Sequence, residues 1–314
     1  MRSGFVESRH RGSVVVLSAG GAVTTSLGAV DVPVLPRSSN KPLQAVALLE
    51  CGWDPADDAL ALAVASHSGE PQHLDVVRRV LADAGLDECA LQNPPMLPLS
   101  EPAAHALLRG GGAASSLTMN CSGKHAGMLA ACVASGWDVA TYRSPEHPLQ
   151  QHITGTLERL AGEPVTHVAV DGCGAPQHAL TLTGLARGFL ALVDASPGTP
   201  ERRVADAARK HPELVGGTDR EVTAVMRAVP GLLAKDGAES VYAAAVPGVG
   251  AVALKVEDGA WRAAPVALTA ALRLLGVPER HGVEAGVDTE ALDALARPPV
   301  RGGGQVVGEL RPAF

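Results

Sequence analysis

The chain has 314 residues, enough to bury a large core, and its 46% hydrophobic and 19% charged residues are ordinary for a globular protein. A formal net charge of −7 without long basic runs argues against a nucleic-acid partner, because phosphate contacts need clustered lysine and arginine. No window approaches the ~20 apolar residues of a membrane span, and residues 1–13 lack the apolar stretch of a secretory signal. Five scattered cysteines, an odd number, do not indicate a disulfide framework, so we expect a cytoplasmic protein with no membrane partner.

The predicted elements begin with a β-hairpin formed by residues 13–17 and 22–27 around a glycine-rich turn. A helix is predicted over residues 41–50 from the helical spacing of its apolar positions, and Gly52 ends it. The continuous apolar run 59–65 fits a buried strand and a buried helix equally well, because periodicity does not distinguish the two.

The later elements are predicted to be helices at first and strands near the end. Helices are expected at 73–84, 148–161, 201–210 and 266–275, and an alanine-rich helix after His125 should end at Ala134. Strands are expected at 165–170, 241–245 and 251–257. The strands of the N-terminal hairpin and the last strands of the chain should pair in an antiparallel sheet with helices on its faces, which is an α/β (α+β) fold. We expect a single unit over residues 1–314, with a mainly helical subdomain inserted at roughly 40–235. The order of strands and helices disfavours a Rossmann fold, and no nucleotide-binding motif occurs.

Ser38 and Lys41 form an S-x-x-K pair at the start of the helix predicted over 41–50. Three residues of helix put both side chains on one face, so the lysine amine can approach the serine hydroxyl. A serine needs a base to take its proton, and a lysine is such a base only when desolvation or a neighbouring cation keeps it neutral. Ser38 is therefore the candidate nucleophile and Lys41 its base, while Arg37 adds a cation for a substrate carboxylate. The alternative is a helix-capping serine beside a surface lysine.

Ser66 and Lys235 are two further candidates. Ser66 follows the apolar run 59–65 where the chain is expected to emerge at a pocket rim, and its hydroxyl would relay protons between Lys41 and a leaving amine. Lys235 is predicted in a glycine-containing loop before a strand, like the K-T-G element that accompanies S-x-x-K in penicillin-recognising enzymes. Its charge would keep Lys41 neutral or stabilise an oxyanion. A turn-capping serine and a solvated loop lysine are the alternatives.

Two cysteines, Cys121 and Cys173, stand in glycine-containing loops at element boundaries, with His125 and Asp171 close to them in sequence. Thiol and imidazole groups gathered in this way are typical zinc ligands. The pattern holds only two cysteines and no CxxC, so a pair of buried free thiols is the alternative interpretation.

Five ordered blocks carry a resemblance to the L-asparaginase II family of rhizobial type, the third structural class of asparaginase. The blocks are Arg37-Ser38-x-x-Lys41-Pro42, Ala65-Ser66-His67-Ser68-x-Glu70, Asn120-Cys121-Ser122-Gly123-Lys124-His125, Asp171-Gly172-Cys173 and Lys235-x-Gly237. They span residues 37 to 237, and their shared order makes the resemblance specific in a way that no single motif is.

The resemblance implies the fold of the serine β-lactamases, penicillin-binding proteins and glutaminases, and a homodimer. It implies Ser38 as nucleophile, Lys41 as base, and Ser66 and Lys235 as a second serine–lysine pair. The family's zinc position matches Cys121, Lys124 and Cys173, and its substrate pocket matches Arg37, Asn120, His125 and Asp171. A lysine binds a metal only when neutral, so zinc occupancy should depend on pH.

The predicted reaction is hydrolysis of L-asparagine to L-aspartate and ammonia through a Ser38 acyl-enzyme. Arg37, His125 and Asp171 would hold the α-carboxylate and α-ammonium groups of the substrate. Glutaminase or β-lactam hydrolase activity would use the same serine and lysine, and one methylene is discriminated by only ~1 to 3 kcal/mol. A zinc-dependent binding protein with an idle Ser38 is the alternative outside the hydrolases.

Overall fold

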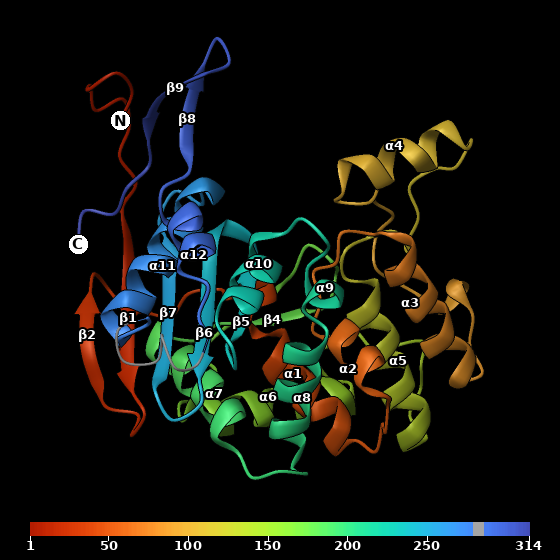
Figure 1. Cartoon of the computed structure of the whole chain (residues 1–314). Coiled ribbons are helices and arrows are strands. Elements are labelled where there is room, and N and C mark those ends of the chain that lie inside the picture. Colours follow the sequence, from red (N-terminus) through yellow and green to blue (C-terminus); the bar gives the residue numbers. More distant parts are fainter. Residues whose placement is uncertain (279–285) are drawn as a thin grey trace.

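A five-stranded antiparallel sheet forms the centre of the computed structural model, which describes residues 1–278 and 286–314 (Figure 1). The strand order is β2-β1-β7-β6-β5. The strands are β1 (Gly12–Ser18), β2 (Val23–Leu27), β5 (Leu233–Gly237), β6 (Val241–Val246) and β7 (Gly250–Val256). The N-terminal hairpin and the pairing of the first strand with a late one, β1 with β7, are as predicted from the sequence.

Two helices cover the sheet. α7 (Leu182–Asp194) packs against β1, β6 and β7, and α11 (Ala264–Leu275) packs against β1 and β7 on the opposite face (Figure 1). The sheet is therefore buried on both sides, and Val15 and Val16 in β1 are fully inaccessible to solvent. This confirms the predicted α/β architecture of an antiparallel sheet flanked by helices.

Most other helices lie between β2 and β5 in the sequence, in the region where a helical subdomain was expected. They are α1 (Lys41–Glu50), α2 (Asp57–Ala63), α3 (Pro71–Asp83), α4 (Glu101–Arg109), α5 (Ser122–Ser135), α6 (Pro148–Ala161), α8 (Pro200–Lys210), α9 (Pro212–Val215) and α10 (Glu221–Ala228). A short hairpin of β3 (Val168–Val170) and β4 (Pro176–His178) interrupts them. α4 has no buried residue and projects from the rest of the chain (Figure 1).

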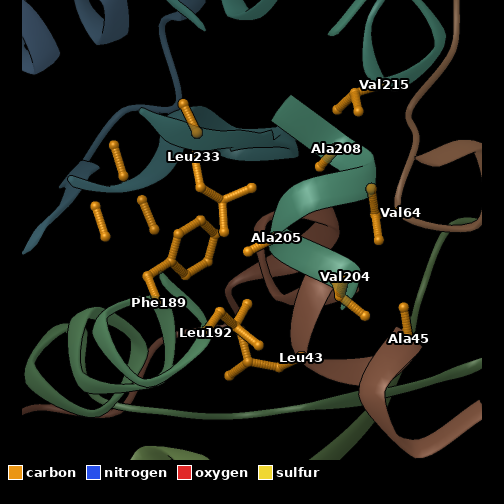
Figure 2. Close-up of a cluster of buried hydrophobic side chains, with 14 of the residues drawn as sticks. Leu43, Ala45, Val64, Phe189, Leu192, Val204, Ala205, Ala208, Val215 and Leu233 are labelled. Atoms are coloured by element: carbon orange, nitrogen blue, oxygen red, sulfur yellow. The ribbon is translucent and has the colours of Figure 1, made fainter. Parts of the chain in front are cut away.

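The core that joins the sheet to the helical region is built from aliphatic side chains of modest size. Figure 2 shows Phe189 and Leu192 of α7 beside Leu43 of α1, Ala205 of α8 and Leu233 of β5. Aromatic residues make up only 3% of the chain, so Phe189 is one of the few large side chains here. The small residues allow the helices to approach one another and β5 closely.

The structure corrects and completes several predicted elements. The apolar run 59–65 belongs largely to the helix α2 rather than to a strand, and the strand predicted at 165–170 is limited to Val168–Val170. Lys235 lies in the strand β5, not in a loop before a strand. The sequence did not predict α7, α10, α12 (Thr289–Ala296) or the C-terminal hairpin of β8 (Pro299–Gly302) and β9 (Gln305–Glu309). No helix among the described residues is long and apolar enough to cross a membrane.

Candidate active site

Ser38 lies in a single 3₁₀ turn, Arg37–Asn40, that runs directly into α1. Ser39 closes the turn by donating its hydroxyl hydrogen to the carbonyl of Pro36 at 2.7 Å. Arg37 has a φ of +53°, which an L-residue with a long side chain rarely adopts and which places strain immediately before Ser38. Among the described residues the Ser38 hydroxyl has no hydrogen-bond partner, and the residue is 8% exposed. Its oxygen is therefore not held in an internal contact.

The last residue of β5 packs against the backbone of this turn. Gly237 lies so close that a Cβ built on it would be 2.4 Å from the Pro36 carbonyl oxygen and 2.9 Å from the Ser39 nitrogen. Only glycine permits this approach between a strand and the backbone of the turn. The position of Ser38 is thus fixed by packing against β5, two residues beyond Lys235.

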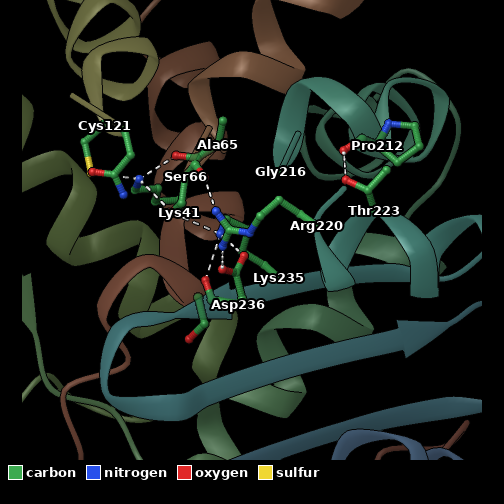
Figure 3. A network of polar contacts seen from close by, with 12 residues as sticks. Lys41, Ala65, Ser66, Cys121, Pro212, Gly216, Arg220, Thr223, Lys235 and Asp236 are labelled. Atoms are coloured by element: carbon green, nitrogen blue, oxygen red, sulfur yellow. Dashed lines mark hydrogen bonds and ion pairs between the residues drawn. The ribbon is translucent and has the colours of Figure 1, made fainter. Parts of the chain in front are cut away.

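Three of the predicted catalytic side chains meet in one buried cluster (Figure 3). The Lys41 amine donates to the Ala65 carbonyl at 2.5 Å and lies 3.3 Å from the Ser66 hydroxyl, and the Lys235 amine lies 3.1 Å from the same hydroxyl. Both lysines are inaccessible to solvent, at 1% and 0% exposure. Ser66 therefore bridges two buried amines. In the described residues the Lys41 backbone N–H donates to the Ser38 carbonyl, but no hydrogen bond joins the Lys41 amine to the Ser38 hydroxyl.

Lys235 has partners that the sequence did not reveal. Its amine donates to the carbonyl and to a carboxylate oxygen of Asp236, and Arg220 donates to the other carboxylate oxygen at 2.8 Å. Burial lowers the pKa of Lys235 to about 8; the Asp236 carboxylate opposes this shift and the Lys41 amine adds to it. Asp236 directly follows the motif residue Lys235, so its position in the sequence could indicate a role in the site, whereas Arg220 belongs to no motif.

Arg37 and Asp171 form a partly buried ion pair beside the thiol of Cys173. Arg37 Nε donates to Asp171 Oδ1 at 2.7 Å, and the Arg37 side chain is 25% exposed against 6% for Asp171. Asp171 follows β3, which places it beside the turn that carries Ser38. The guanidinium end groups of Arg37 have no protein acceptor among the described residues, so they remain able to bind a carboxylate.

Cys121, Lys124 and Cys173 also come together, next to Lys41. Lys41 Nζ is 3.0 Å from Cys121 Sγ, and Lys124 Nζ is 3.1 Å from Cys173 Sγ. A hydrogen bond from Cys121, with the nearby Lys124 charge, holds the pKa of Cys173 well below its usual range despite burial. The same hydrogen bond between the two free cysteines, together with burial, raises the pKa of Cys121. Burial alone would lower the pKa of Lys124, but both thiols and Asp171 raise it.

This donor set fits a zinc ion once two protons are removed. In the chain as described, no three His, Cys, Asp or Glu side chains are grouped to hold a metal, so Lys124 is needed as the third ligand. Two sulfurs and one nitrogen, all buried, are ligands that zinc accepts, with one position left open. Cys121 and Lys124 must both lose protons, so zinc would bind more tightly as the pH rises.

His125 and Asn120 border the thiol cluster. The His125 ring is fully buried, burial lowers its pKa, and its Nδ1 is 2.6 Å from the hydroxyl of Tyr142. Burial raises the pKa of Tyr142 to about 12, so the phenol is protonated and donates to Nδ1. The histidine then carries its hydrogen on Nε2, which is buried without a hydrogen-bond partner among the described residues and lies near Cys173. Asn120 is half-buried, and its side-chain oxygen lies 3.8 Å from Cys121 Sγ.

A large cavity lies elsewhere in the molecule. It has a volume of about 1010 Å³ and is bounded by residues 6–14, the end of β7, α11 and the C-terminal tail. None of the predicted site residues lines it. The candidate catalytic residues therefore lie outside this cavity.

None of the curated proteins compared matches the chain. Two solved structures have weak overall similarity: the native form of Mglu, with 15% identity over 87% of the chain and a TM-score of 0.44, and a "putative beta-lactamase from Bacteroides dorei", with 14% identity over 79% of the chain and a TM-score of 0.43. The matched regions are 64% of Mglu and 86% of the Bacteroides dorei protein, so the chain spans less than two thirds of the length of Mglu.

A family model gives a match of a different kind. The model of L-asparaginase II matches residues 1–312, almost the whole length, and thus includes every residue of the cluster around Ser66. The chain belongs to the L-asparaginase II family.

Proposed function

We propose that the chain hydrolyses the side-chain amide of L-asparagine through an ester formed on Ser38, with Lys41 as the base. Family membership supports L-asparagine as the substrate. The observation that carries the mechanism is the pair of fully buried lysines that share the Ser66 hydroxyl beneath the Ser38 turn. Buried amines are costly, and two of them around one hydroxyl are a feature of proton-transfer sites rather than of a packed core.

The two buried amines differ in their counter-ions. Two ammonium groups around one hydroxyl repel each other, so one amine gives up its proton more readily. Lys235 has the Asp236 carboxylate as a counter-ion, while the acceptors of Lys41 are a carbonyl, a hydroxyl and a thiol. The proposed mechanism therefore leaves the proton on Lys235, whose carboxylate counter-ion opposes the effect of burial that lowers the pKa of this amine to about 8.

The reaction then follows two steps. Ser38 Oγ attacks the amide carbon as its proton passes to Lys41, and a proton relayed through Ser66 leaves with ammonia. Water then hydrolyses the ester, with Lys41 as base, to give L-aspartate and free Ser38. Because no hydrogen bond joins the Lys41 amine to the Ser38 hydroxyl among the described residues, the substrate must bring these two groups together or a small rotation of the Ser38 side chain must do so.

Arg37 and Asp171 would bind the two charged groups of the amino acid. The free end of the Arg37 guanidinium suits the α-carboxylate, and the Asp171 carboxylate suits the α-ammonium group. Asn120 and His125 would complete the binding site. Holding both charged groups fixes the distance to the amide, which favours asparagine over the longer glutamine.

Zinc would be held by Cys121, Lys124 and Cys173. When bound, it would supply a fixed positive charge that orients the substrate and shapes its pocket. Cys121 and Lys124 must each lose a proton before they bind zinc. Because the pKa values of both groups are raised, zinc occupancy should depend on pH. The homodimer implied by the family resemblance and the cytoplasmic location expected from the cysteine pattern stay proposals as well.

Ammonia release from asparagine and from glutamine tests the proposal. The wild-type protein should release ammonia from asparagine, and Ser38→Ala should lose most of this turnover, by a factor of about 10³ or more. Ser39→Ala is the matched control, because its hydroxyl only closes the turn through Pro36. Wild-type turnover in Ser38→Ala would exclude the ester mechanism and leave a zinc-dependent binding protein as the alternative. Faster release from glutamine would assign the chain as a glutaminase.

A further inference from the structure

Asp236 is a buried carboxylate placed between two cations. Its side chain is 5% exposed; Lys235 Nζ lies 2.5 Å from Oδ1, and Arg220 Nη2 lies 2.8 Å from Oδ2. A carboxylate with so little access to water is stable only when both oxygens are paired, which is the case here. The two cations bind separate oxygens, so Asp236 joins Arg220 and Lys235 without a direct contact between them.

The contacts around Lys235 direct one N–H of its amine at Ser66. A lysine amine has three substituent positions besides its carbon, and acceptors occupy them at Asp236 O (2.7 Å), Asp236 Oδ1 (2.5 Å) and Ser66 Oγ (3.1 Å). The two Asp236 oxygens only accept hydrogen bonds, so they use two N–H groups and direct the third position at Ser66.

Arg220 holds the other side of this arrangement. Besides Asp236, its guanidinium reaches the Ser66 carbonyl at 3.5 Å and lies over the ring of Trp261 at 5.9 Å. Arg220 stands at the N-terminal end of α10 and thus connects β5 with the segment that follows α2 (Figure 3). One side chain therefore contacts both the backbone of Ser66 and the counter-ion of Lys235.

We propose that Asp236 and Arg220 are positioning residues for asparagine hydrolysis: Arg220 orients the Asp236 carboxylate, and this carboxylate holds the Lys235 amine on Ser66. The catalytic consequence rests on the proposed function, whereas the positioning itself does not. The charged groups that face the Lys235 amine are Asp236 on its own strand, Arg220 before α10 and Lys41 at the start of α1. Removing the Asp236 charge takes this counter-ion away from the basic groups Arg220, Lys41 and Lys235, so Lys235 should lose its proton at a lower pH.

Lysine-selective NMR tests the positioning without using activity. The chain has only five lysines, so ¹³C-lysine labelling gives few Cε signals, and Lys235→Arg identifies the one from Lys235. In Asp236→Asn the titration midpoint of Lys235 should fall by about 1 pH unit or more. Asp206→Asn is the matched control, because Asp206 also lies between two arginines, Arg202 and Arg209, but on the surface. An unchanged Lys235 midpoint in Asp236→Asn would overturn the proposal.

Kinetics then test the link to the reaction. Asp236→Asn and Arg220→Gln should lower kcat about 10- to 100-fold with KM little changed, and should move the alkaline limb of the pH profile to lower pH. Arg220→Lys keeps a cation but loses the forked contact, so it should recover only part of the rate and serves if Asp236→Asn does not fold. Wild-type rates and an unshifted profile in folded variants would refute the catalytic link. If the wild-type protein releases no ammonia from either amide, the proposed function fails. The NMR titration still decides by itself whether Asp236 positions Lys235.

Discussion

The contact between Gly237 and the Ser38 turn gives a sharp test of how the site is positioned. The backbone of Gly237 has a φ of −135°, which suits any residue, so the only obstacle to Gly237→Ala is the space its methyl group needs. The added Cβ would lie 2.4 Å from the Pro36 oxygen, about 1 Å inside ordinary van der Waals contact. Both neighbours are backbone atoms, so either β5 or the turn must move.

The expected effect is larger on turnover than on folding. Overpacking of this kind costs about 1 to 3 kcal/mol of unfolding free energy. A displacement near 1 Å at the nucleophile reduces kcat/KM about 10²-fold, since Ser38 and Lys235 sit on the two segments that are pushed apart. Urea unfolding and ammonia release measure the two effects in the same preparation.

Gly155→Ala is the control for this substitution. Gly155 lies on α6, is exposed and has no atom within 4 Å of an added Cβ. Its replacement should raise the unfolding free energy by about 0.4 to 1 kcal/mol and leave turnover alone. If Gly237→Ala keeps both wild-type stability and wild-type kcat/KM, the packing of β5 on the turn does not position Ser38.

Three more predictions follow from the same geometry. Arg37→Gly keeps the φ of +53° accessible but removes the guanidinium, so KM for asparagine should rise about 10- to 100-fold, the value of a charged hydrogen bond, while Ser38 still forms its ester; an unchanged KM would remove Arg37 from substrate binding. Cys121→Ser should weaken zinc and asparagine binding more than it lowers the melting temperature, and full zinc content with unchanged kinetics would contradict this. Burial lowers the pKa of His67 and of His73 below the unfolded value near 6.5, so stability should be full above pH 6.5 and fall as the pH drops below it. Urea midpoints at pH 7.5 and 5.5 measure the loss, which His67→Gln should reduce and the exposed control His105→Gln should leave as it is.

The elements that could be predicted are those whose own residues favour one structure. The helix at 41–50 has helical apolar spacing, and the hairpin has a run of β-branched residues before a glycine-rich turn; both elements are present. α7 is not among the predicted helices, although its apolar residues recur at helical spacing; it contains two glycines, which disfavour a helix, and it packs against β1, β6 and β7. β5 was missed because Leu233–Gly237 contains two charged residues and a glycine, and it becomes a strand only through pairing with β6.

The site shows the same limit. The S-x-x-K spacing, Ser66 and Lys235 could be recognised because motifs mark them, and the structure brings Lys41, Ser66 and Lys235 together. Arg220 lies far from these residues in sequence and no motif marks it; only the fold places it on Asp236. The roles of the site residues and the single-unit organisation of the chain stay predictions.

The most direct test of the central claim is to trap the intermediate. Acid quenching during turnover of asparagine, followed by peptide-mapping mass spectrometry, should find an aspartyl ester on the peptide that contains Ser38, and Ser38→Ala should abolish it. An ester found instead on Ser66, or rapid turnover with no ester on any serine, would contradict the assignment of Ser38 as the nucleophile.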